Sequence, residues 1–76
     1  MTEETLIDVR WLAPPEPFER IVDALESLPP SGTLHVLIHR EPRPLFEWLQ
    51  REGYRFRHGY NKEGWFDIFI SRAEAD

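Results

Sequence analysis

The sequence predicts a two-layer α/β sandwich with the element order β-α-β-α-β-β, formed by one domain over residues 1–76 whose ordered core covers about 5–72. Two strand-like runs each lead into a proline-x-proline corner, Pro15-Glu16-Pro17 and Pro42-Arg43-Pro44, and each corner opens a stretch of helical periodicity. Proline suits the first turn of a helix, where its missing N–H had no partner anyway. Two further alternating runs follow, joined by a short turn, as in a β-hairpin.

The first half of the chain predicts a strand, a helix and a second strand. Residues 6–10 alternate between apolar and polar side chains, as a short strand does. Residues 15–28 place their apolar side chains at helical spacing, with acidic residues in the first turn, where the helix dipole favours negative charge. The segment 29–32 holds two prolines and a glycine that end this helix, and residues 33–39 alternate again.

The second half predicts a helix and a hairpin. Residues 42–52 form the helix, and Gly53 is expected to end it in the left-handed conformation. Residues 54–60 and 65–71 form two strands around a turn at 61–64. Because strand–helix–strand crossovers are right-handed, both helices are expected on the same face of a four-stranded mixed sheet.

Side-chain alternation assigns the strand residues to two faces of this sheet. The helix-covered face is expected to hold Ile7, Val9, Leu34, Val36, Ile38, Phe66, Ile68 and Ile70. The open face is expected to hold Leu6, Asp8, His35, Leu37, His39, Arg55, Arg57, Trp65, Asp67 and Phe69. Large apolar groups beside charges are typical of interfaces, so Trp65 and Phe69 are candidates for binding a protein partner or a second copy of the chain. The alternative is that arginine stems cover these rings.

The composition excludes several classes of function. A net charge of −5 and a pI near 5.1 argue against a nucleic-acid-binding protein, because phosphate binding needs a basic face. No apolar run approaches the ~20 residues of a membrane span and no signal peptide is recognisable, so a cytoplasmic protein without a membrane partner is expected. The chain has no cysteine, which excludes disulfides, thiolate metal sites and persulfide chemistry.

The first corner resembles the signature of the TusA-like (SirA-like) proteins, in which a short strand ends in Gly-Leu-x-Cys-Pro-x-Pro and opens the first helix. Here Trp11 stands at the usual glycine, Pro14 at the cysteine, and Pro15 and Pro17 at the two prolines. The cysteine-less relative called the domain of unknown function 2249 family is more similar, and its motifs match Asp8-Val9-Arg10, Pro14-Pro15-Glu16-Pro17 and Glu41-Pro42-Arg43-Pro44-Leu45-Phe46. This resemblance implies the sandwich fold and an association with respiratory and redox metabolism, without a defined reaction.

The resemblance also implies where a sulfur carrier would hold its persulfide, namely at the corner made of Pro14, Pro15, Glu16 and Pro17. This corner lacks the thiol, and its prolines lack N–H groups, so Glu16 and Phe18 are expected to be the main backbone donors there. The first-turn acids repel a second anion. We therefore expect no sulfur transfer and weak phosphate binding, and purely structural prolines are the simplest interpretation.

Enzyme activity is not expected of this domain. Asp8, His39, Glu41 and Asp67 offer acid–base groups, but no serine, threonine or cysteine stands in a recognisable nucleophile context. A general base also needs a pocket that holds substrate, and a chain this short offers a cleft at best.

The second corner offers a different surface, carried by Arg40, Glu41 and Arg43. Two arginines close together at a strand-to-helix turn suit a carboxylate or a phosphate, which they bind bidentately. The alternative is that Arg43 pairs with Glu47 one helical turn later, a contact worth a few tenths of a kcal/mol.

The three histidines give weak candidates for a metal site. His35 and His39 lie roughly 13 Å apart at about 3.3 Å per strand residue, so they cannot share one ion. His39 with His58, or His39 with Asp8 on a neighbouring strand, stay open as pairs, while the spacings of structural zinc sites are absent. No metal and no cofactor is therefore expected.

These observations favour a small cytoplasmic binding or adaptor module on a sulfur-carrier-like scaffold without the thiol. Its contacts are expected at the two corners, at Asp8 and Arg10, and on the open face around Trp65. The alternative function is a small-ligand or redox-cofactor-binding protein of respiratory, sulfur or nitrogen metabolism that uses His39, Asp8 or His58.

Overall fold

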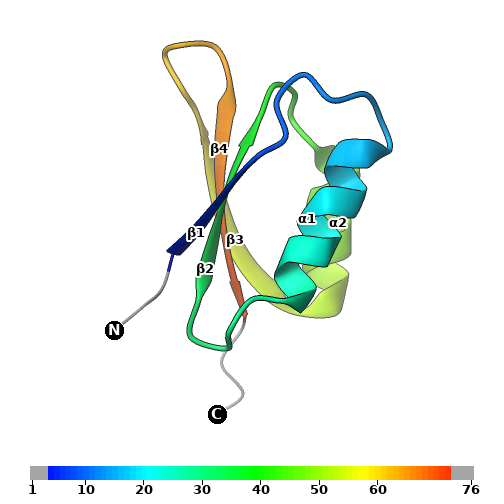
Figure 1. The fold of residues 1–76 in the computed structure, drawn as a ribbon, viewed down its shortest axis with the longest axis vertical. Helices are drawn as coiled ribbons and strands as arrows, with labels where there is room; N and C mark the ends of the chain where they lie inside the picture. The colour runs from blue at the N-terminus through cyan, green and yellow to red at the C-terminus, as the bar shows by residue number, and fades with distance from the viewer. Residues whose placement is uncertain (1–3, 73–76) are drawn as a thin grey trace.

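The computed structural model describes residues 4–72, which form a four-stranded mixed sheet with both helices on one face (Figure 1). The elements in chain order are β1 (Glu4–Asp8), α1 (Glu16–Glu26), β2 (Thr33–Ile38), α2 (Arg43–Glu52), β3 (Tyr54–Tyr60) and β4 (Phe66–Arg72). The predicted element order and two-layer architecture are confirmed. Neither described helix is long and apolar enough to cross a bilayer.

The largest boundary errors concern β1 and α1. β1 begins at Glu4, two residues before the predicted start, where Glu4 and Thr5 pair with Thr33 and Leu34 of β2. It ends at Asp8, two residues before the predicted end, because the Asp8 carboxylate accepts the Arg10 backbone N–H at 3.0 Å and turns the chain. α1 ends at Glu26 rather than at residue 28, because the N–H groups of Ser27 and Leu28 bond carbonyls three residues back. The predicted frayed ends at residues 1–3 and 73–76 lie outside the described residues.

The remaining boundaries differ by one residue. β2 ends at Ile38 rather than at residue 39, and α2 begins at Arg43, with Pro42 as its N-cap. β4 runs from Phe66 to Arg72, one residue later than predicted.

The strand order is β1-β2-β4-β3, so the hairpin folds back with its second strand against β2. β1 and β2 are parallel, with Ile7 opposite Val36, and the other two pairs are antiparallel. β4 takes a central position because Ile68 and Ile70 are fully buried there, while β3 carries arginines that suit a solvent-exposed edge.

One hydrophobic core fills the layer between the sheet and the helices. Its fully or almost fully buried members are Val9, Ile21, Leu25, Leu28, Leu34, Val36, Ile38, Leu45, Leu49, Ile68 and Ile70. Aromatic side chains close its sides, for example where Phe18 of α1 meets Trp48 of α2 edge to face at 5.9 Å. The predicted helix-facing residues of the sheet are confirmed, with Ile7 and Phe66 at the half-buried margin.

Both helices begin at prolines, as predicted. Pro15 is the N-cap of α1 and Pro17 lies in its first turn; Pro42 and Pro44 occupy the same positions in α2, and neither helix has a side-chain N-cap. Gly53 ends α2 with φ of 84°, which confirms the left-handed cap.

Candidate functional site

The two proline corners lie at the same edge of the sheet. β1 and β2 are adjacent and parallel, so the loops that follow them, and the helix N-termini that these loops reach, share one end of the molecule (Figure 1). The carboxyl edge of parallel strands is where open α/β sheets usually bind ligands. The fold therefore unites two segments that are separate in sequence.

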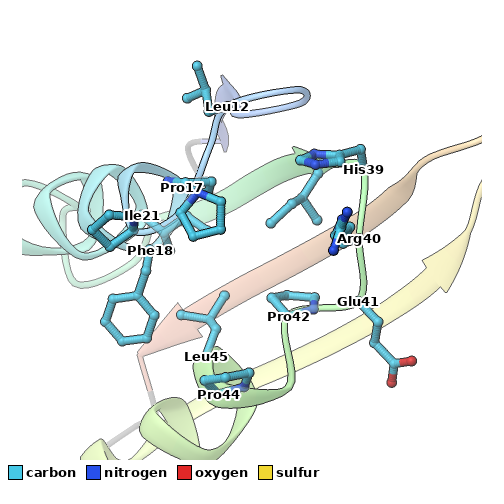
Figure 2. Close-up of a pocket in the computed structure, with 13 residues that line it drawn as sticks. Leu12, Pro17, Phe18, Ile21, His39, Arg40, Glu41, Pro42, Pro44 and Leu45 are labelled. Atoms are coloured by element: carbon cyan, nitrogen blue, oxygen red, sulfur yellow. The ribbon is translucent and has the colours of Figure 1, made fainter.

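A cavity of about 210 Å³ opens between these corners. Figure 2 shows side chains of α1 on one side and side chains of α2 on the other. From the first corner it is lined by Leu12, Pro14, Pro15, Pro17, Phe18 and Ile21. From the second corner it is lined by Ile38, His39, Arg40, Glu41, Pro42, Pro44 and Leu45. Its lining is mostly apolar, and its few polar groups all come from the loop after β2.

The backbone at these corners is poor in hydrogen-bond donors, as expected because proline has no backbone N–H. The Glu16 N–H donates to the carbonyl of Ala13 at 3.0 Å, so the expectation that Glu16 offers a free donor is wrong. In the first turns, Phe18 of α1 and Leu45 of α2 have N–H groups without a backbone acceptor among the described residues. Each corner therefore retains one such donor, and both residues line the cavity.

His39 belongs to this cavity and not to the open face. It follows the last residue of β2, and its Nδ1 accepts the backbone N–H of Trp11 at 2.9 Å. The two rings lie 5.0 Å apart. The predicted position of His39 on the open face is wrong because β2 ends one residue before it.

Trp11 does not line this cavity but adjoins two residues that do, Leu12 in sequence and His39 through its ring, and its backbone conformation is strained. Its φ is 69°, in the left-handed region that bulky residues rarely adopt, and its side chain is 73% exposed. Most described large apolar side chains are covered, and Leu6 and Tyr60 are the other exposed ones. Backbone strain at a residue with an exposed indole is typical of functional sites, where residues in rarely populated conformations cluster.

The second corner carries the charges of the cavity rim. Arg43 is highly exposed, and its Nε lies 3.8 Å from Glu41 Oε2, so the alternative pairing with Glu47 is not observed. Arg40 lines the cavity and has no carboxylate within ion-pair distance in residues 4–72. Whether these arginines clamp an anion together stays a prediction.

The open face carries a first polar cluster around Trp65. Arg10 binds the Asp8 carboxylate at 2.8 and 2.7 Å through two side-chain nitrogens, and its guanidinium covers the Trp65 ring at 4.4 Å. The Arg10 side chain and backbone donors lower the pKa of Asp8 to about 2. The Trp65 indole N–H is buried without a hydrogen bond of normal geometry, although it helps to lower the pKa of Asp67.

A second cluster lies around Phe69. His35 stacks on its ring at 4.2 Å from one side, and Arg57 sits 5.0 Å from the ring centroid. His35 Nε2 is 2.9 Å from Asp67 Oδ1, and this hydrogen bond is the main reason why the pKa of Asp67 is lowered. The structure therefore shows the arginine-covered arrangement for both aromatic residues, and a partner at this face stays a prediction.

The histidines do not converge. His58 stacks on Phe46 of α2 at 4.5 Å, whereas His39 contacts Trp11 and His35 contacts Asp67. Within residues 4–72 no group of three or more His, Cys, Asp or Glu side chains is arranged to hold a metal ion. The Asp8 carboxylate is engaged by Arg10.

The sequence patterns predicted neither the cavity, nor Leu12 in its wall, nor the left-handed backbone of Trp11 next to it. One signal was available, because Trp11 occupies the position where the resembled sulfur carriers have glycine. Glycine is the residue that most readily adopts a left-handed backbone, and the structure shows Trp11 in that conformation with φ of 69°.

The fold and corner geometry together define a SirA-like sandwich without a thiol at its corner. A crystal structure of a SirA-like protein from Desulfitobacterium hafniense is similar over 97% of this chain and 100% of that chain, with a TM-score of 0.78 and 23% sequence identity. The chain belongs to the family of uncharacterised conserved proteins DUF2249, which matches residues 6–72. No curated protein matches the sequence. The DUF2249 resemblance is thus confirmed as family membership, and the SirA-like resemblance is confirmed for the fold.

Proposed function

We propose that this protein is a small binding module that takes an apolar side chain of a partner protein into the cavity between the two proline corners. The observation that carries the proposal is the cavity itself, which is apolar and holds about 210 Å³. Sites for drug-sized ligands and cofactors usually hold about 300–1,000 Å³. The cavity is therefore matched to one or two side chains rather than to a cofactor.

The surroundings of the cavity support the same proposal. Trp11 projects beside it with 73% of its surface exposed, and tryptophan is enriched among the residues that dominate binding energy at protein interfaces. The proline rings in the rim are rigid, so little conformational entropy is lost when a partner covers them. The cytoplasmic location and the absence of enzyme activity stay predictions.

The experiment that tests this proposal is selection of peptides from a random phage-displayed library against the immobilised protein, followed by binding measurements with two matched variants. Leu12→Asp places a charge at the cavity wall. Leu6→Asp places the same charge on the open face, where Leu6 is 60% exposed. We expect selected peptides to share an apolar anchor, to bind Leu6→Asp normally and to lose at least about tenfold in affinity for Leu12→Asp, since an apolar hot spot is worth 1–2 kcal/mol or more.

The reverse pattern would refute the proposal. Peptides that bind Leu12→Asp normally and fail on Leu6→Asp would place the binding surface on the open sheet face. Circular dichroism melts of both variants show whether each retains the fold.

A further inference from the structure

The rim of the corner cavity is electrostatically asymmetric. The first turn of α1 contains Glu16 and Glu19, which offset the positive end of its helix dipole. The first turn of α2 contains no acid and instead carries Arg43. The α2 side of the cavity therefore carries two arginines, Arg40 and Arg43, and one acid, Glu41, which precedes the N-cap Pro42, so its charge is net positive.

Three groups on the α2 side are positioned to meet a negative charge. Arg40 lines the cavity and has no carboxylate within ion-pair distance among the described residues. The Leu45 N–H has no backbone acceptor within residues 4–72, while the neighbouring N–H groups of Arg43 and Phe46 donate to Glu41 and Pro42 at 3.1 Å each. The Arg43 side chain is 81% exposed and only loosely paired with Glu41.

The arrangement combines an apolar cavity with one rim on which two arginines outnumber one glutamate. A ligand that fills the cavity alone leaves Arg40 and the Leu45 N–H with water as their partner. A ligand that carries a carboxylate next to its apolar group satisfies both and makes charge-assisted hydrogen bonds, which are stronger than neutral ones. On the α1 side, the Glu16 carboxylate is already paired with Arg20 at 3.3 Å.

We propose that the partner segment carries a carboxylate directly beside the apolar side chain that enters the cavity, and that this carboxylate docks against Arg40 and the N-terminus of α2. This inference rests on the proposed function and adds the chemistry of the partner: an acidic peptide segment with an aliphatic anchor. Arg40 is then the residue that sets specificity and orientation, while the cavity provides the apolar contact.

The test uses two blocked hexapeptides titrated into ¹⁵N-labelled protein and followed by amide NMR shifts. One is acetyl-Ser-Gly-Leu-Asp-Gly-Ser-amide, and the other replaces its Asp with Asn, which keeps the shape and removes the charge. We expect shifts around Leu12, His39 and Leu45 and an affinity about two- to tenfold higher for the Asp peptide, as exposed ion pairs and helix-dipole contacts allow.

Two charge variants make the test specific. Arg40→Gln is expected to lose most of the preference for the Asp peptide, because only the N-terminus of α2 then remains to meet its carboxylate. Arg51→Gln, in the last turn of the same helix, removes the same charge at the far end and is expected to keep the preference. A preference that vanishes equally in both variants would mean overall attraction and would overturn the inference.

The outcomes separate this inference from the proposed function. Equal binding of the Asp and Asn peptides by the natural protein would overturn the acidic-partner inference and leave the cavity as an apolar site. If either peptide shifted only protein amides on the open face, or if millimolar peptide shifted none, both the inference and the proposed function would be overturned.

Discussion

The backbone N–H of Trp11 donates to Nδ1 of His39 at 2.9 Å, and this bond joins the loop after β1 to the loop after β2. Because Nδ1 is the acceptor, the neutral ring carries its proton on Nε2. The same bond holds Trp11 at φ of 69° and sets its ring 5.0 Å from the imidazole ring. The exposed indole is thus held in place by His39, a residue that lines the cavity.

The first prediction concerns Trp11→Gly. Glycine adopts the left-handed conformation without steric cost, whereas other residues lose roughly 1–2 kcal/mol there. The ring contact with His39 is lost, but little burial is lost with it, because the side chain is 73% exposed. We expect the free energy of unfolding in urea to stay unchanged or to rise by up to about 1 kcal/mol, while affinity for cavity-binding peptides falls.

A substitution that stabilises the fold and weakens binding distinguishes a functional residue from a structural one. A loss of stability of more than about 1 kcal/mol in Trp11→Gly, with peptide binding intact, would show that the indole supports the fold instead.

The second prediction concerns acid stability at Asp8. Its folded-state pKa of about 2 lies below its ordinary value of 3.8, because Arg10 donates side-chain and backbone hydrogen bonds to the ionised carboxylate. A lowered folded-state pKa means that folding favours the charged form, so the contribution is fully present above about pH 4 and is lost as the pH falls through about 2. Since the pair is exposed, the effect is small.

Asp8→Asn isolates this contribution. We expect the variant to unfold at lower urea concentration than the natural protein at about pH 5, and the two midpoints to converge as the pH falls to about 2 and below, where Asp8 takes up its proton. If the difference in unfolding free energy between the two proteins stayed constant from about pH 5 to about pH 2, the Arg10 contact would contribute through neutral hydrogen bonding alone. The lowered pKa of Asp67 affects the natural protein and the variant equally.

The sequence predicted the elements well because each boundary has a local cause. Pro15 and Pro42 mark helix starts, and Gly53 marks a helix end, whatever the rest of the chain does. The errors arose where a side chain competes with the backbone. Asp8 accepts the Arg10 N–H and ends β1 early, and no alternation pattern contains that information.

The candidate site was predictable only in part. Side-chain alternation along the strands placed His35 and Asp67 on one face of the sheet, and they do form a hydrogen bond there. The same rule gave the wrong face for His39, because alternation applies only within a strand and β2 ends at Ile38. The cavity depends on the parallel pairing of β1 with β2 and on the positions of two helices, which are tertiary properties that a single sequence does not display.

The third prediction compares two glycines. Gly53 ends α2 with φ of 84°, and Gly59 lies in β3 without a positive φ, while an added Cβ meets nothing within 4 Å at either position. Space is therefore equal at the two sites and only the backbone conformation differs. We expect Gly53→Ala to lose about 1 kcal/mol in urea unfolding and Gly59→Ala to be neutral or to gain up to about 1 kcal/mol. Equal losses in both would mean that the left-handed cap carries no cost for alanine.

The fourth prediction concerns the C-terminal end of α1, which has no basic residue in its own last turn. Arg72, at the end of β4, fills that role: its Nη2 lies 3.2 Å from the Leu25 carbonyl oxygen and 3.1 Å from that of Leu28. These bonds reach one carbonyl in the last turn of α1 and one just beyond it, and they place a positive charge at the negative end of the dipole. We expect Arg72→Ala to lower the free energy of unfolding by about 1 kcal/mol, since one charged donor serves two carbonyls at a partly exposed site.

Arg55→Ala is the matched control for Arg72→Ala, because Arg55 is an exposed arginine of β3 with no side-chain hydrogen bond among residues 4–72. Its expected change is within about 0.5 kcal/mol, as for most surface substitutions. Amide hydrogen exchange adds a local measurement: protection in the last turn of α1 should fall in Arg72→Ala while protection in β2 falls only with global stability. Equal stability of the two variants, with unchanged exchange at Leu28, would show that the helix end is held by packing of Leu25 and Leu28 in the core and that Arg72 contributes nothing to it.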